Sequence, residues 1–555
     1  MLESLKKQIK EMVESELGIS SLVVENPKKG TADLAIPLFG LVKVLNRPMN
    51  DCFEIVKSII VKIDLIENVD FIAGFLNIYI SRVKFSLYVL NEVYEKNDSY
   101  GQKELNNKTI VIDYSSPNIA KSFSMGHLRS TMIGNSLKNI YSKEGYNVIG
   151  INHLGDWGTQ FGKNIVAYEK WGKLETIKKD PTNELQKLYV KFHKEASEHP
   201  ELEEEARKVF KLLEEGNDKY IALWKWIKDA VLVDLMKTYD RLGVSFDSYA
   251  GEAFYNDKMD TVVKELEDKG LLEVDQGASI VRLDNMPPAI IKKSDGTTLY
   301  ITRDLAALLY RYKTYHFDKI VYAVGNEQKL HFEQLIEVAK KMGYNFDIEH
   351  VNFGLVLFEG KKLSTRHGKT AKLDDVLNEA VAQAKASVLE KNPDLKDKNG
   401  VAEAVGIGAI LFNDLKNERH LDYDLNIESM LKFEGQTGPY LQYSGVRISS
   451  ILKNEKLDIN SIDEKYFNED HYFDLVKLIS QFSNVIERAA DNNSPAVVAR
   501  YLIAIAQAFN HFYGKQKIVV DDAGHKNANL LLINDVRIVL KNGLRLLGIK
   551  PLNEM

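Results

Sequence analysis

Thr109-Ile110-Val111-Ile112-Asp113-Tyr114 is the stretch of this sequence that decides its fold. It is a short, β-branched run of the kind that forms a buried strand. Ser115-Ser116-Pro117-Asn118 interrupts it, a helical pattern begins at Gly126, and Val148-Ile149-Gly150-Ile151 supplies a second strand. Strand, loop, helix and strand in this order predict the opening of a doubly wound, nucleotide-binding sheet.

Around this sheet the sequence predicts several domains, because the chain has 555 residues and a domain typically takes about 100–200. The predicted segments are a small α/β unit at 1–82, a helix near 83–96, a polar linker at 97–104, a charged helical region at 174–245, further strand-like stretches at 319–324 and 351–357, and helices from about 376 to the end. The sequence therefore predicts an α/β multidomain protein with a helical C-terminal part.

Composition excludes several classes of protein. The single cysteine, Cys52, excludes a disulfide framework and a Cys-rich zinc site. No window holds ~18 consecutive apolar residues and the first residues lack the apolar core of a signal peptide, so we expect no membrane span and a cytoplasmic location. The net charge of −6 argues against a generally basic surface, so RNA contacts must come from local patches such as the basic tail at 515–555.

The helix start at Ser124-Met125-Gly126-His127 is the first candidate for chemistry. A helix N-terminus offers N–H groups and a positive dipole end, both of which suit phosphate. Gly126 allows a flat group such as adenine to approach closely, and His127 can donate to a phosphate oxygen. On this segment alone, a plain capped helix with a core histidine is an equal alternative.

A second candidate is the cation-rich, Gly-flanked segment at 359–370. Its ending, Gly368-Lys369-Thr370, is similar to the close of a phosphate-binding P-loop. That motif needs a glycine five residues before Gly368, where Leu363 stands, so the P-loop interpretation fails. The segment would instead hold phosphates with the charges of its side chains.

Two such elements in the two halves of one sheet resemble the class I aminoacyl-tRNA synthetases: Ser124-Met125-Gly126-His127 resembles their HIGH motif and Lys362-Leu363-Ser364-Thr365 their KMSKS motif. The surrounding residues resemble the arginyl-tRNA synthetase family. The similar segments, in the same order and spread over essentially the whole chain, are 115–118, 126–131, 152–162, 299–304, 363–366 and 438–443.

The resemblance implies a class I Rossmann-type fold that joins L-arginine to tRNA(Arg), with ATP as substrate, Mg²⁺ as its companion and no metal held by protein ligands alone. The implied domains are an N-terminal tRNA (D-loop) contacting domain at 1–82, a helix and linker at 83–107, the catalytic domain at 108–375 with its helical insertion around 174–245, a helical connecting (stem) region at 376–436 and an anticodon-binding helical bundle at 437–555. We expect the chain to act as a monomer.

For ATP, the resemblance implies that His127 and the helix start serve the phosphates, that Lys362 serves the pyrophosphate, and that Gly126 and Ser364 complete the site. Such groups catalyse by positioning and by neutralising the charge that develops on the phosphates.

Two residues depart from the family pattern. Ser124 stands in place of the first histidine of HIGH, and its hydroxyl can donate one hydrogen bond but cannot carry charge. Thr365 stands in place of the last lysine of KMSKS. Family members that lack this lysine carry one just upstream of HIGH, so we expect Lys121 to be the substitute cation.

For arginine, Tyr300 and Asp304 are four residues apart on one helix face, and the resemblance implies that they hold the guanidinium together with Glu252. The residues implied to hold the α-amino and carboxylate groups are Ser116, Asn118 and Gln328, with Asp113 as a further candidate. A pocket built around buried acceptors rejects lysine or citrulline by about 10⁴–10⁵-fold, so no editing domain is expected.

For tRNA, unstacked bases are expected to stack on aromatic side chains. The implied residues are Tyr440, Tyr443, Arg447, Tyr513 and Met555 in the anticodon bundle, and Phe75 and Asn77 in the first domain.

Three alternatives remain to be compared with this interpretation. Another class I synthetase lacks support, because a cysteinyl enzyme needs thiol ligands and a glutamyl-type enzyme needs no acidic pocket. A synthetase-like protein that binds tRNA without charging it is motivated by Ser124 and Thr365 alone. A dehydrogenase is disfavoured because Gly406-Ile407-Gly408 lacks a third glycine and lies in an Ala-rich helical segment, where small residues indicate close packing.

Overall fold

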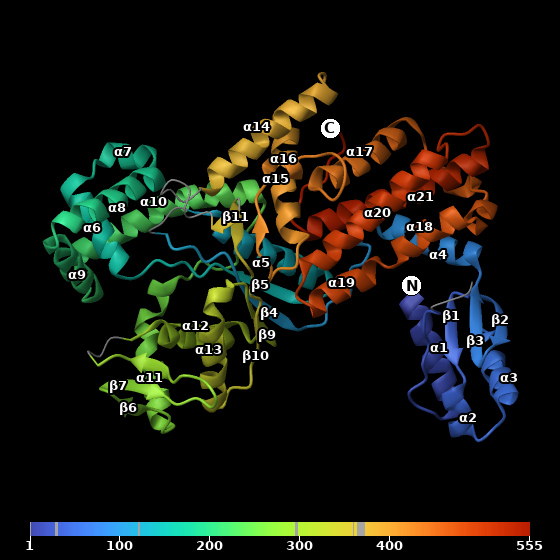
Figure 1. Ribbon diagram of the computed structural model, residues 1–555, viewed down its shortest axis with the longest axis horizontal. Helices are drawn as coiled ribbons and strands as arrows, with labels where there is room; N and C mark the ends of the chain where they lie inside the picture. The colour runs from blue at the N-terminus through green and yellow to red at the C-terminus, as the bar shows by residue number, and fades with distance from the viewer. Residues whose placement is uncertain (1, 28–31, 120–122, 295–297, 359, 363–371) are drawn as a thin grey trace.

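A four-stranded parallel sheet lies at the centre of the computed structural model, which describes residues 2–27, 32–119, 123–294, 298–358, 360–362 and 372–555 (Figure 1). The strand order is β10 (Asp347–His350), β9 (Lys319–Tyr322), β4 (Thr109–Asp113), β5 (Asn147–Ile151). The chain runs from β4 to β5 on one side and from β9 to β10 on the other, so the sheet has its switch point between β4 and β9. Ligands bind at the carboxyl ends of the strands at such a point.

The strands at the centre of the sheet are apolar because both faces of the sheet are covered. Ile110, Val111 and Ile112 of β4 are buried, as are Ile320 and Val321 of β9. The predicted strand at 351–357 is wrong in its position. The sheet strand β10 ends at His350, and β11 (Val356–Phe358) pairs with β12 (Lys361–Lys362) and β13 (Tyr423–Asp424) in a separate small sheet.

Helices surround the sheet and extend from it. The helix that follows β4 is α5 (Met125–Lys143). The helical insertion comprises α6 (Thr159–Trp171), α7 (Leu174–Lys179), α8 (Pro181–Glu198), α9 (Glu201–Glu214) and α10 (Asp218–Leu242). The second half of the catalytic region contains η2 (Glu252–Lys258), α11 (Met259–Asp268), β6 (Glu273–Asp275), β7 (Ala278–Val281), β8 (Ala289–Lys292), α12 (Tyr300–Tyr315), η3 (Asn326–Gln328) and α13 (Lys329–Lys341).

The C-terminal part is helical, as predicted, apart from the two residues of β13. Its elements are α14 (Leu373–Lys391), α15 (Lys398–Leu415), α16 (Ile427–Met430), α17 (Gly438–Asn454), η5 (Ile459–Ser461), η6 (Glu464–Asn468), α18 (Asp470–Ser480), α19 (Phe482–Asp491), α20 (Pro495–Lys515) and α21 (Ala523–Leu546). Gly408 does mark close packing, because a Cβ on Gly438 of α17 would lie 2.5 Å from the Gly408 carbonyl oxygen.

The N-terminal unit is a three-stranded antiparallel sheet with helices packed against it. Its elements are α1 (Leu2–Leu17), β1 (Leu34–Pro37), α2 (Phe39–Leu45), α3 (Met49–Ile60), β2 (Ile66–Ile72) and β3 (Phe75–Ile80), with the strand order β1-β3-β2. Cys52 is buried in α3. In Figure 1 this unit and the helical insertion lie at opposite ends of the long axis, with the parallel sheet between them.

The stretch predicted as a linker is instead docked on the C-terminal helices. After α4 (Arg82–Lys96) the chain forms η1 (Asn97–Ser99), and the buried Tyr100 stacks on Phe482 with ring centres 5.8 Å apart. Asp98 pairs with Lys541 and Arg545 of α21. The polar composition misled the prediction, because these polar side chains have partners far away in the sequence. Within the described ranges, no helix is long and apolar enough to cross a membrane.

Candidate active site

A cavity of about 610 Å³ opens where β4 and β9 end. Every residue that the sequence predicted for arginine lines it, namely Asp113, Ser116, Asn118, Glu252, Tyr300, Asp304 and Gln328. Gly126 and His127 line the same cavity. The fold therefore brings the predicted amino-acid side and the predicted phosphate side of the site together, in one space at the switch point of the sheet.

The turn after β4 forms the floor of the cavity and is held by hydroxyl groups. Ser115 and Ser116 both have positive φ angles, 70° and 43°, which residues other than glycine rarely adopt. The Ser116 hydroxyl donates to Asp113 at 2.7 Å, and Ser130 donates to the carbonyl oxygen of Ala323 at 2.5 Å while accepting from the Ser115 amide at 2.9 Å. Strain of this kind persists where the surrounding contacts enforce it, as they do here.

Asp113 is paired before any ligand arrives. Arg311 of α12 reaches it at 2.8 Å, and both side chains are buried. A buried charge is costly unless it is paired, and here each charge has the other as its partner. Asp113 therefore brings acceptor oxygens to the cavity, but the pair as a whole carries no net charge.

Asp304 is an acid of the cavity whose two carboxylate oxygens each face a histidine. Its Oδ2 is 2.6 Å from Nε2 of His331, and its Oδ1 is 4.0 Å from Nε2 of His153. Burial acts to raise the pKa of Asp304, but the hydrogen bond from His331 and the nearby cations outweigh it, so the pKa lies below its ordinary value. Asp304 is therefore an ionised acceptor for a cation.

His153 is fixed in one protonation state by its neighbours. Burial and the Arg311 guanidinium lower its pKa, and Arg311 Nη2 lies 3.1 Å from its Nδ1. Because a guanidinium can only donate, Nδ1 must accept, and the proton of the neutral ring is on Nε2, toward Asp304.

Glu252 is held at the other side of the cavity by a buried aspartate. Asp156 accepts from the amide of Ala253 at 2.9 Å and pairs with Lys228 of α10, which fixes the start of η2. Burial raises the pKa of Glu252 to about 7, although Arg303, 3.6 Å away, opposes the rise. Glu252 is thus partly protonated near neutral pH in the ligand-free cavity.

The helix start that resembles HIGH is a reciprocal cap. His127 is the third residue of α5, and its Nδ1 accepts from the Ser124 amide at 3.0 Å while Ser124 caps the helix in return. The acceptor role of Nδ1 places the imidazole proton on Nε2, where it can be donated to a ligand. Among the described residues, a Cβ on Gly126 would meet only the Ser124 hydroxyl, at 3.7 Å.

Several predicted catalytic residues lie outside the described residues. These are Lys121, Ser364 and the side chain of Lys362, whose backbone pairs with Leu357 of β11. Where the described chain resumes, Lys372 bridges to Ser124, and the Leu373 amide donates to the carbonyl oxygen of Phe123 at 3.0 Å. The chain therefore begins α14 directly beside the start of α5.

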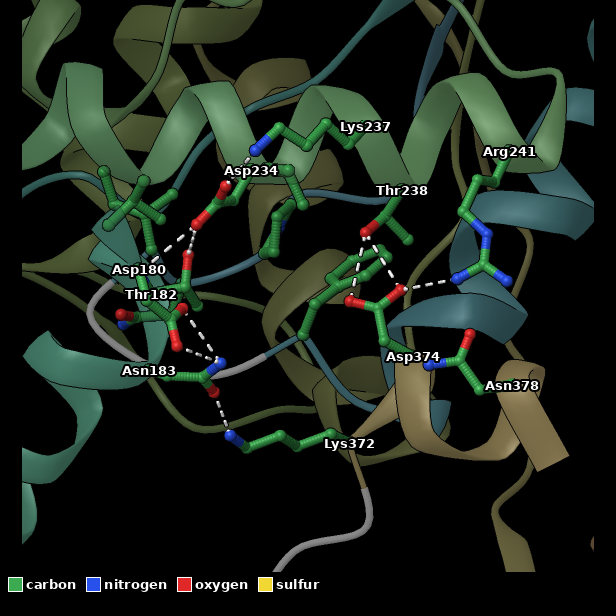
Figure 2. A pocket seen from close by; sticks show the side chains of 16 residues that line it. Asp180, Thr182, Asn183, Asp234, Lys237, Thr238, Arg241, Lys372, Asp374 and Asn378 are labelled. Carbon is green, nitrogen blue, oxygen red and sulfur yellow. Dashed lines mark hydrogen bonds and ion pairs between the residues drawn. The ribbon is translucent and has the colours of Figure 1, made fainter. Parts of the chain in front are cut away.

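A second cavity, of about 360 Å³, lies beside the first and shares Asn118 with it. Figure 2 shows that polar side chains from the insertion face the start of α14 across this space. Lys372 donates to Asn183, while Asp374 accepts from Thr238 and pairs with Arg241 at 3.4 Å. The first residues of α14 are thus tied both to the helix start of α5 and to the insertion.

The predicted aromatic residues of the bundle also come together. Arg447 of α17 lies between two tyrosine rings, 5.0 Å from the centre of Tyr443 and 5.1 Å from that of Tyr513. Asn510, which the sequence analysis missed, accepts from Arg447 and donates to the Tyr440 hydroxyl at 3.0 Å. We call Tyr440, Tyr443, Arg447 and Tyr513 the tyrosine face.

Of the remaining predicted tRNA residues, Met555 is linked to the tyrosine face through α14, whereas Phe75 and Asn77 lie in the first domain. The carbonyl oxygen of Met555 accepts from Asn392 at 3.2 Å, next to Lys391, whose ammonium lies 5.6 Å from the ring centre of Tyr443. In the first domain, Phe75 packs edge-on against Phe39, and the side chain of Asn77 donates to Asp70 at 2.8 Å.

Sequence reasoning missed the positioning residues of the cavity. His153 and Asp156 lie inside the quoted segment 152–162, and His331 follows Gln328 by three residues, so a neighbouring motif marked each of them. Arg311 had no such signal, because its partner Asp113 lies far away in the sequence.

A parallel sheet with a capped helix start at its switch point is the architecture of a class I aminoacyl-tRNA synthetase. Comparison with protein families agrees: residues 89–427 match the catalytic domain of class I (R) tRNA synthetases, residues 1–80 the arginyl-tRNA synthetase N-terminal domain, and residues 441–555 the DALR anticodon-binding domain. The chain belongs to the arginyl-tRNA synthetase family.

Individual relatives agree with this assignment. The chain is 49% identical to the arginine–tRNA ligase of Pediococcus pentosaceus, over 96% of this chain and 95% of that protein. It is 48% identical to the arginine–tRNA ligase of Exiguobacterium sibiricum, with the same coverage. Among solved structures, the arginyl-tRNA synthetase of Thermus thermophilus superposes over the whole of both chains with a TM-score of 0.84 at 23% identity, which shows a shared fold.

Proposed function

We propose that this protein is an arginine–tRNA ligase. It activates L-arginine with ATP to arginyl-adenylate, releases pyrophosphate, and transfers the arginyl group to tRNA(Arg) with release of AMP. The observation that carries the proposal is that Asp304 and Glu252 line the same cavity as Gly126 and His127 of the capped helix start.

Asp304, Tyr300 and Glu252 hold the guanidinium in this proposal. Asp304 is ionised and fixed by His331, so it meets the cation without having to reorganise. Charge-assisted hydrogen bonds to a planar fork are specific as well as strong. Ser116, Asn118 and Gln328 hold the α-amino and carboxylate groups, and Asp113 offers its remaining acceptor capacity to the ammonium.

The phosphate side is served by the start of α5. His127 donates from Nε2 to the α-phosphate, and Gly126 leaves room for the adenosine. Lys121, Lys362, Ser124 and Ser364 complete this side as cations and donors. The substrate carboxylate attacks the α-phosphate in line, and the P–O bond to pyrophosphate breaks.

Mg²⁺ enters this proposal as the companion of ATP. Mg²⁺ usually keeps several of its waters and is bound through substrate phosphates rather than by a dedicated set of protein ligands. When bound, it neutralises part of the triphosphate charge.

We assign tRNA contacts to two parts of the chain. The tyrosine face and Met555 take anticodon bases in the bundle at 437–555, while Phe75 and Asn77 contact the D-loop from the unit at 1–82. In this proposal the enzyme acts as a monomer. Since its substrate is tRNA, we place the enzyme in the cytoplasm.

ATP–pyrophosphate exchange with each amino acid, with and without tRNA(Arg), tests the function. Of the amino acids, only arginine should support exchange, and only when tRNA(Arg) is present, and the same preparation should arginylate tRNA(Arg). Binding of tRNA without exchange or arginylation under either condition would instead favour the binding-only alternative.

A further inference from the structure

A separate polar cavity of about 300 Å³ lies between α17, α21 and the last residues of the chain. We call it the tail cavity, and its polar lining includes Gln442, Ser449, Arg537, Lys541 and Arg545. A helix turns by about 100° per residue, so Gln442, Gly445 and Ser449 lie on the face of α17 opposite to Tyr440, Tyr443 and Arg447. The tail cavity is therefore distinct from the tyrosine face.

The tail cavity is lined by cations and by no acid. Arg537, Lys541 and Arg545 are spaced by four residues and lie along one face of α21, and the lining contains no Asp or Glu. Asp98 pairs with Lys541 at 2.9 Å and with Arg545 at 3.0 Å, but it is not part of the lining. Three positive charges therefore face one acid, and the cavity keeps a positive potential.

A neighbouring buried acid, Asp535, lies in surroundings that disfavour its charge. Asp535 is almost fully buried in α21, and burial raises its pKa well above its ordinary value. Its charged form is therefore less favourable than that of an exposed aspartate. Arg537 donates to the amide oxygen of Asn534 at 3.0 Å, which is a neutral partner.

Two donors at the cavity lack a partner. Among the described residues, nothing accepts from Nε of Arg537 or bonds to the hydroxyl of Ser449, although both atoms are buried. Buried donors without partners are costly and rare in folded proteins. A third atom, Oε1 of Gln442, lacks a partner too, but that amide lies against Gly408, at the α15 side.

We propose that the tail cavity binds a phosphate group, and that the backbone of the tRNA supplies it. A guanidinium fork, an ammonium and a hydroxyl together match the oxygens of a phosphate. The tRNA source rests on the proposed function and on position: an adjacent cavity, lined by Met555, shares Ser449, Arg537 and Asn553 with the tail cavity. A strand bound at the end of the chain can therefore reach both.

Binding of tRNA(Arg) at several salt concentrations tests the tRNA source. Arg537→Gln and Lys541→Met should each weaken binding by about tenfold, because a charged hydrogen bond is lost. Each should also lower the slope of log affinity against log salt by about one. The loss should be equal on a transcript with a changed anticodon, since phosphate contacts carry no sequence information.

The matched control is Lys526→Met, which removes one positive charge from the same helix but lies outside the cavity. It should leave the slope unchanged, and no variant should alter the arginine KM. Thermal unfolding checks that each variant is folded. If Arg537→Gln does not fold, Lys541→Met still tests the proposal, because Lys541 is partly exposed.

A second arm separates the two sources of phosphate. The Tm of wild type and Arg537→Gln is measured in inorganic phosphate and in chloride at equal ionic strength. A changed tRNA slope supports the backbone phosphate. An unchanged slope with a phosphate-dependent rise in Tm, absent from Arg537→Gln, supports a site for a free phosphate instead. An unchanged slope and no such rise overturn the proposal, while failure of wild type to charge tRNA would overturn the proposed function alone.

Discussion

The proposed arginine pocket, which contains Asp304 and Glu252, and the tyrosine face hold their side chains in place by different means. In the pocket, charged groups already hold one another: Asp304 is bonded to His331, and Glu252 lies beside Arg303. On the tyrosine face, a cation is held between aromatic rings, because Arg447 lies over both Tyr443 and Tyr513. The first arrangement is selective for charge, whereas the second offers stacking surfaces.

This difference predicts which single substitutions should have large effects on ligand binding and which should have small ones. Removal of one partner from a buried charged network leaves the other partner unpaired, which is expensive. Removal of one ring from an exposed stack loses only that contact, and Tyr513 is 40% exposed. The pocket should therefore be sensitive to single changes in charge, and the face should respond more gradually.

The largest effect is expected for Asp304→Asn, which keeps the shape but removes the charge. Loss of one partner of a buried charged hydrogen bond costs roughly 2–5 kcal/mol, a rise of about 30- to 4000-fold in the arginine KM. The KM for ATP should change little, because Asp304 lies on the amino-acid side. Steady-state exchange kinetics measure both values. Equal losses for the two substrates would show that Asp304 is structural.

Next in size is the effect of Tyr443→Ala on tRNA. Stacking contributes ~1–3 kcal/mol per base, so the KM for tRNA should rise by about 5- to 150-fold while arginine and ATP binding stay unchanged. Tyr88→Ala, at an exposed tyrosine of α4, is the matched control. A transcript changed at the middle anticodon base sharpens the test. If the losses from enzyme and transcript simply add, Tyr443 does not contact that base.

The pH dependence of arginine binding tests whether the pocket recognises its ligand through charge. Glu252 is protonated below its pKa of about 7 and charged above it, and the guanidinium favours the charged form. Arginine affinity should therefore fall by up to about tenfold as the pH drops by one unit below 7. Glu252→Gln should bind arginine more weakly at high pH and lose most of this dependence, as titration calorimetry can measure. A dependence that persists in Glu252→Gln would assign it to another group.

The sequence predicted the sheet and named residues that the fold brings to one cavity, because both are encoded locally. The β-branched run at Thr109–Tyr114 needs no distant partner to be recognised, and Asp304 lies within a segment that resembles a known family. The confirmed fold class follows from such local signals. Residues whose role depends on a distant partner were harder to predict from the sequence.

Arg311 and Asp98 illustrate that limit. Arg311 neutralises Asp113 from a helix that begins almost 190 positions later, and Asp98 docks a supposed linker on α21. The positions of β10 and β11 were missed for a related reason. The apolar run at 351–357 contains Val351 and Phe353, which are buried without belonging to a strand of either sheet.

The smallest effect is expected at the tie between the insertion and α14, which belongs to neither region of the comparison. Asp374→Asn weakens the contact with Arg241, and such partly exposed ion pairs contribute about 0–1 kcal/mol. Since Leu373 is bonded to Phe123, a looser start of α14 should disturb the phosphate side. The rate of arginine activation should fall by up to about fivefold, with the arginine KM unchanged.

Glu403→Gln is the matched control for this prediction, because Glu403 is the other acid bound to Arg241, at 2.8 Å, and it lies on α15. It removes one charge from the same arginine without touching the start of α14. Single-turnover measurement of adenylate formation compares the two variants with saturating substrates. A slower rate in Asp374→Asn alone would show that the contact between Asp374 and Arg241 contributes to the activation step. Equal rates in both variants would show that the contact serves folding, since an interaction that acts only in the transition state must lower the rate itself.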